Sequence, residues 1–118
     1  ERGFLCFHRE ATADSVSTQS FYYKVFLKNT HGSLSLTTPT VTETDTANRF
    51  TFALAASIND SATTTNRKTA PALTFDNSLK AVPATLAAGD AIGVWICATH
   101  PAGEPSANST YTLTLSGV

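Results

Sequence analysis

Apolar and polar residues alternate in several stretches of the chain, which is the pattern of strands that bury one face. The pattern is clearest at 21–28, where Phe21, Tyr23, Val25 and Leu27 fall on one side of the predicted strand. The same alternation predicts further strands at 3–9, at 50–54 with an extension to 58, at 91–98 and at 110–115.

Weaker signals predict additional short strands. Leu34 and Leu36 begin a segment that we expect to reach Val41, with a break at Pro39 because proline has no N–H for a sheet ladder. The segments 72–75 and 78–83 suggest two more, and turn residues follow at 29–32 and 86–90. Helical spacing is absent apart from 81–88, where Pro83 argues against a helix.

Evenly spaced short strands separated by turns predict a sandwich or barrel. We therefore expect an all-β chain folded as a single two-sheet antiparallel β-sandwich, immunoglobulin-like or jelly-roll, with about seven or eight strands. At 118 residues without internal repeats or a linker, 1–118 is predicted to be one domain.

Composition narrows the function classes. Charged residues make up 14% of the chain against a usual value of about 25%, and the net charge is −1. No basic stripe is present, so we expect no nucleic-acid partner. No apolar run approaches the length of a membrane span, so we expect no membrane partner. The polar segment 59–69 and the segment 11–20 are predicted to be exposed loops.

The two cysteines, Cys6 and Cys97, lie far apart in the sequence. The favoured interpretation is two buried thiols that pack as small apolar side chains. The alternative is a disulfide between the first strand and a late strand, which would indicate an oxidising compartment. Zinc is not expected, because the closely spaced ligand pairs of zinc sites are missing.

No residue pattern indicates catalysis. The histidines His8, His31 and His100 are isolated, and Cys97 with His100 is a poor nucleophile and base because Cys97 lies in a predicted strand beside Trp95. We therefore expect no enzyme activity, no metal and no cofactor. The carboxylates are expected to be turn and cap residues rather than a catalytic pair or a calcium site: Glu43, Asp45, Asp60, Asp76, Asp90 and Glu104.

Three aromatic residues remain as a possible interaction surface: Tyr22, Phe26 and Trp95. The alternation places their side chains on the face of the strand opposite to the predicted core positions. Such residues either form an aromatic platform for sugars or pack against neighbouring molecules in an assembly. We favour packing between molecules.

Two stretches of the chain carry recognisable motifs. The first is YKVFLKNTH at 23–31, followed by a Leu-x-Leu strand at 34–36. The second is LAAGDAIGVWI at 86–96, followed by Pro-Ala-Gly at 101–103 and a Tyr-x-Leu-x-Leu strand at 111–115. Together these stretches resemble segments of structural proteins from tailed bacteriophages. The Gly turn and the Pro-Ala-Gly loop are also similar to bacterial surface domains of immunoglobulin-like architecture.

The resemblance implies a non-catalytic structural or assembly protein of a phage particle, such as a capsid decoration, tail or baseplate component in the virion. Its partners would be further copies of the chain or other virion proteins, bound through strand edges and loops. The alternative is a secreted cell-surface or carbohydrate-binding β-sandwich module, for which the partner would be a polysaccharide.

Overall fold

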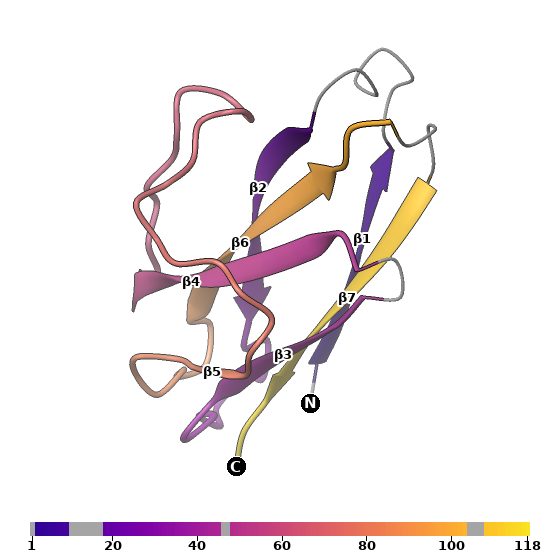
Figure 1. Cartoon of the computed structure of the whole chain (residues 1–118). Coiled ribbons are helices and arrows are strands. Elements are labelled where there is room, and N and C mark those ends of the chain that lie inside the picture. Colours follow the sequence, from indigo (N-terminus) through magenta and orange to yellow (C-terminus); the bar gives the residue numbers. More distant parts are fainter. Residues whose placement is uncertain (1, 10–17, 46–47, 104–107) are drawn as a thin grey trace.

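The chain forms two antiparallel β-sheets in the computed structural model, which describes residues 2–9, 18–45, 48–103 and 108–118 (Figure 1). No helix among these residues is long and apolar enough to cross a membrane. The strands in chain order are β1 (Arg2–Arg9), β2 (Gln19–Lys28), β3 (Thr40–Asp45), β4 (Phe50–Ile58), β5 (Lys80–Ala81), β6 (Ala91–His100) and β7 (Asn108–Ser116).

One sheet has the strand order β1-β7-β3-β5 and the other has the order β2-β6-β4. Six strands of six to ten residues are present in the described part of the chain, fewer than the seven or eight predicted. The remaining segment, β5, has two residues and pairs only with the start of β3. The predicted all-β character is confirmed, and β1 and β2 belong to different sheets.

The two sheets enclose a shared apolar core. Val41 of β3 and Leu113 of β7 contribute from one sheet, while Phe52 of β4 and Ile96 of β6 contribute from the other, and all four are fully buried. Burying each such side chain stabilises the fold by roughly 1.5–3 kcal/mol. The arrangement is therefore sandwich-like, with the alternating apolar residues of both sheets facing inward.

The strong alternating segments are confirmed as strands, but the predictions for the region around Pro39 are wrong. Leu36 makes only an isolated bridge to Leu86, and β3 begins at Thr40 after the proline. The strand then continues to Asp45 through residues that are mostly polar. Its outward positions are threonines, so the sequence of this strand shows no apolar alternation that would reveal it.

The segments 72–75 and 78–83 are also not the strands predicted. Leu73 N–H donates to the Pro71 carbonyl in a turn, and Asp76 then forms a single bridge with Phe52 of β4. Within 78–83 only the two residues of β5 pair. Turn-forming hydrogen bonds take up the backbone groups that a strand would need.

Candidate functional site

The three aromatic residues predicted as an interaction surface lie on one face of the β2-β6-β4 sheet. In the β2–β6 pairing, Tyr22 is opposite Cys97, Lys24 is opposite Trp95 and Phe26 is opposite Gly93. These positions alternate along β6 with buried core residues, so their side chains project from the outer face of the sheet. Residues far apart in sequence are thus brought together by strand pairing.

A long connection, residues 59–79, covers this outer face, and we call it the strap. It begins at the end of β4, crosses to the edge strand β2, and then comes back to β4 at the opposite edge of the sheet (Figure 1). At β2 the Tyr22 N–H donates to the Arg67 carbonyl at 2.6 Å, and at β4 the Phe52 N–H donates to the Asp76 carbonyl at 3.0 Å. The strap therefore contacts both edge strands of the sheet and crosses over β6 between them.

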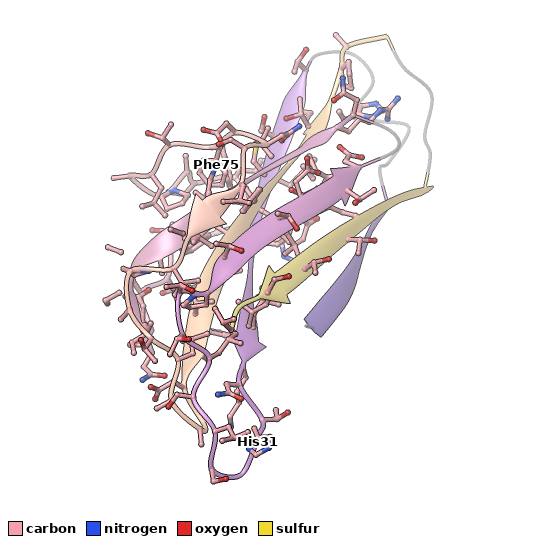
Figure 2. All side chains as sticks on the ribbon, turned by 90° about the horizontal axis from the view of Figure 1, so that it is seen from below. His31 and Phe75 are labelled. Carbon is pink, nitrogen blue, oxygen red and sulfur yellow. The ribbon has the colours of Figure 1, made fainter. Side chains whose placement is uncertain are left out.

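The strap changes which of the three aromatic residues is accessible. Trp95 is only 5% exposed, and Tyr22 is half-buried against Phe75 of the strap, with ring centres 5.5 Å apart in an edge-to-face arrangement. Phe26, beyond the strap, is 52% exposed. Of the predicted surface, Phe26 alone presents most of an aromatic ring to solvent. Figure 2 shows Phe75 far from the loop that follows β2, where His31 lies at the tip.

Lys24 fastens the strap to the sheet. Its Nζ donates to Asp60 Oδ2 at 2.6 Å and to the Ala62 carbonyl at 2.8 Å. The same ammonium lies 5.3 Å from the centre of the Trp95 ring and 5.2 Å from that of Phe26. The hydrogen bond from Lys24 holds the pKa of Asp60 below its usual range. The exposed fraction of the Lys24 side chain is only 10%, so its charge depends on these partners.

Gly93 makes room for this lysine. A Cβ at this position would lie 2.6 Å from Lys24 Cε and 3.4 Å from the Ala55 side chain, closer to the lysine than atoms pack. Lys24 therefore runs across the sheet directly over the bare backbone of Gly93. A glycine in the middle of a strand often indicates such a close approach.

Further contacts hold the middle and the end of the strap. Lys68 Nζ donates to Gln19 Oε1 at 3.0 Å and lies 5.3 Å from the centre of the Phe21 ring. Near the end of the strap, Asp76 accepts hydrogen bonds from Lys80 and from the backbone and hydroxyl of Ser78. These bonds, that from Lys80 above all, lower the pKa of Asp76 from 3.8 to about 2.

Cys97 is a free, buried thiol, so the favoured interpretation holds for this cysteine and the alternative, a disulfide with Cys6, is wrong. The Cys97 side chain belongs to the outer face of the β2-β6-β4 sheet, whereas Cys6 belongs to β1 of the other sheet. Cys97 Sγ lies 3.8 Å from the Thr99 hydroxyl. Burial, followed by the nearby thiol, raises the pKa of Tyr22 above its ordinary value.

The histidines do not converge in the described part of the chain. His31 Nδ1 accepts the backbone N–H groups of Ser33 and Leu34 at 3.1 and 2.9 Å, which closes the turn after β2. His100 is fully buried on the inner face of β6, opposite in direction to Cys97, so the two cannot act together. No group of three or more potential metal ligands occurs among the described residues. The side chain of His8 lies outside the described residues.

Most of the carboxylates have the turn roles predicted for them. Asp45 Oδ2 accepts the N–H groups of Arg49 and Phe50 at 2.6 and 2.7 Å, and Asp90 Oδ2 accepts that of Ala87 at 3.1 Å. Glu43 is the exception, because it lies within β3 with a buried Oε2. Burial and the nearby Asp45 raise the pKa of Glu43. Glu104 lies outside the described residues.

A cavity of about 390 Å³ lies between the strap and the sheet. Trp95 contributes from β6 and the adjacent Ala55 and Ala56 from β4. The strap contributes its own wall: Asp60, Ala62, Thr63, Thr64, Pro71, Ala72 and Leu73. The volume is within the roughly 300–1,000 Å³ typical of small-molecule sites.

Sequence reasoning singled out Trp95 and gave Asp60 only a turn role, and it missed Lys24, the ion pair of Lys24 with Asp60, and the cavity. No spacing relates Lys24 to Asp60, because their partnership depends on where the strap crosses the sheet. The one available signal was Gly93, a glycine inside an otherwise apolar strand. No family model, curated protein or solved structure matches the chain.

Proposed function

We propose that the chain is a jelly roll. In that fold the first strand pairs with the last in one sheet, while the second pairs with the penultimate strand in the other sheet. The pairings β1–β7 and β2–β6 follow this rule, and β3 and β4 then pair with the other sides of β7 and β6. An immunoglobulin domain instead keeps its first two strands in one sheet. The Asp76 bridge to Phe52 stands where the remaining strand of an eight-stranded jelly roll would pair.

On this fold we propose a non-catalytic structural subunit of a tailed-phage particle, a capsid decoration, tail or baseplate component. The observation that carries the proposal is the strand order, because jelly rolls are a common fold of viral capsid domains. The resemblance of 23–31 and 86–96 to phage structural proteins points the same way. Jelly rolls also occur in lectins, so the experiment must separate assembly from simple binding.

The edges of the two sheets indicate where a neighbour would pair. The strap contacts β2 and β4, which are the edge strands of the smaller sheet. In the larger sheet, β1 pairs with β7 on one side and with no other strand in the described part of the chain. An open edge strand of this kind offers main-chain donors and acceptors to a strand from another molecule. We therefore propose β1 as the assembly edge.

Assembly is tested by light scattering after size-exclusion chromatography and by electron microscopy of the purified chain. We expect a defined multimer, and we expect Leu5→Lys in β1 to reduce it to monomers because edge lysines prevent strand addition. Thr114→Lys, in β7 where the strand is paired with both β1 and β3, is the matched control and should still assemble. A native chain that stays monomeric at all concentrations would refute the proposal.

A further inference from the structure

The walls of the cavity under the strap combine apolar carbon with unpaired polar groups. Leu73, Pro71 and four alanines provide most of its apolar lining beside Trp95. Small residues on both the sheet and the strap leave the space open. An occupant must therefore present carbon–hydrogen faces to most of the wall.

The polar groups of the lining are arranged to both donate and accept. Asp60 Oδ2 is taken by Lys24 and by the Ala62 N–H, which leaves Oδ1 without a partner among the described residues. Thr63 and the Trp95 indole N–H likewise have no hydrogen-bond partner in the described part of the chain. An occupant that fits must supply hydroxyl groups as well as apolar faces, since hydroxyls both donate and accept.

We propose that this cavity binds one pyranose ring of a neutral sugar. A pyranose presents carbon–hydrogen faces that pack on aromatic and aliphatic side chains, and its equatorial hydroxyls reach a carboxylate and a threonine hydroxyl at the rim. A neutral ring is favoured over a charged one because the charge of Asp60 is already balanced by Lys24. This site lies on the other sheet from the β1 edge, so sugar binding and assembly can be tested independently of each other.

The site also differs from an exposed aromatic platform. Trp95 is 5% exposed, so a long polysaccharide cannot lie flat across its ring. The cavity instead accepts a single sugar unit, either free or at the end of a chain. We therefore expect single sugar units to bind and the internal units of a polysaccharide not to bind.

The only tryptophan of the chain is Trp95, so its fluorescence reports on this cavity alone. The intact chain is titrated with the methyl glycosides of glucose, galactose, mannose and N-acetylglucosamine up to about 0.1 M, where a millimolar site is saturated. Glycerol at the same hydroxyl concentration serves as the solvent control. We expect a saturable change for at least one sugar and none for glycerol.

Two substitutions in β4 place the binding in the cavity. Ala56 lines it and Ser57 does not, although the two are exposed neighbours in this strand. Ala56→Leu should therefore abolish binding, and Ser57→Leu, which adds the same side chain next to it, should preserve binding. Circular dichroism checks that each variant folds.

A third substitution tests the polar rim of the cavity. Thr63→Val keeps the shape of the side chain but removes its hydroxyl, and we expect about fivefold to tenfold weaker binding. Unchanged affinity in this variant would contradict the assignment of the Thr63 hydroxyl to the sugar.

A failure to saturate with all four sugars overturns the proposal. So does equal binding by Ala56→Leu and Ser57→Leu, which would move the sugar elsewhere on the surface. If the multimer forms but no sugar binds, the assembly function survives and the sugar site does not. If the chain stays monomeric but binds sugar at this cavity, the sugar site survives and the assembly function does not.

Discussion

At the scale of single residues, Glu43 is a carboxylate whose environment disfavours its charge. Its Oε2 is buried, and burial followed by the nearby Asp45 raises the pKa of Glu43 by more than the Tyr111 hydroxyl lowers it. A raised folded-state pKa means that the protonated acid is favoured in the fold. Its stabilising contribution is present below the unfolded pKa near 4.5 and is lost as the pH rises through the folded value.

We therefore predict that Glu43→Gln increases the free energy of unfolding at neutral pH, because a neutral amide carries no charge to bury. The gain should be larger at pH 7 than at pH 4, where Glu43 itself is largely protonated. Urea unfolding of both proteins at the two pH values measures the difference. A gain of the same size at both would show that the charge of Glu43 is not responsible.

Gly93 and Lys24 test the attachment of the strap. Gly93→Ala places a methyl group against Lys24 Cε, so the lysine has to shift, and we expect this shift to move its ammonium away from Asp60. We predict that the pKa of Asp60 returns toward 3.8, measured by NMR titration of its carboxyl carbon. Lys24→Met, which keeps a long apolar chain without the charge, should produce the same return. An Asp60 pKa that stays low in Gly93→Ala would mean that the lysine moves aside and keeps its partner.

At the scale of elements, the strap covers the sheet without forming a regular strand, and a few specific contacts hold it in place. Turn-closing carboxylates and two edge bonds hold it, and it buries Trp95 and Cys97 as a strand or helix would. A segment held by few contacts is expected to open locally more easily than the strands beneath it. Its end at Asp76 is the place where opening would uncover β4.

We predict that Asp76→Asn accelerates hydrogen exchange of the Phe52 amide, whose acceptor is the Asp76 carbonyl. The pKa of Asp76 is depressed to about 2. Its stabilising contribution to the fold is therefore fully present above pH 3.8 and is lost as the pH falls through about 2. The native protein should therefore show faster Phe52 exchange, relative to the unfolded chain, on acidification across this window. Asn77→Ala, at an exposed neighbouring position, should leave exchange unchanged.

At the scale of the whole molecule, both sheets depend on a single core. Phe52 is fully buried and central to that core, whereas Leu79 is 60% exposed at the end of the strap. We predict that Phe52→Ala lowers the free energy of unfolding by about 3–5 kcal/mol. Leu79→Ala should change it by no more than about 0.5 kcal/mol. Chemical denaturation compares them, and similar losses would mean that the core does not lie between the sheets.

The sequence by itself determined the strands at 3–9, 21–28, 50–58 and 91–98, because alternation is a local property of a half-buried strand. It did not reveal most of β3, whose outward positions are threonines and whose inward positions include Glu43. The period of alternation is invisible where both faces carry polar residues. The turn roles of Asp45, Asp76 and Asp90 were also predictable, since each acts within a few residues of its own position.

Only the tertiary structure decided which aromatic face is exposed. Alternation placed Tyr22, Phe26 and Trp95 outside the core, but the strap returns over the sheet and buries Trp95. That path depends on long-range contacts such as Lys24 with Asp60, which leave no periodic signal in a Thr-rich segment. Sheet membership likewise separated Cys97 from Cys6. Local patterns determine which segments form strands. Which side chains are exposed on the surface depends on the pairing of distant segments, because that pairing forms only together with the whole core.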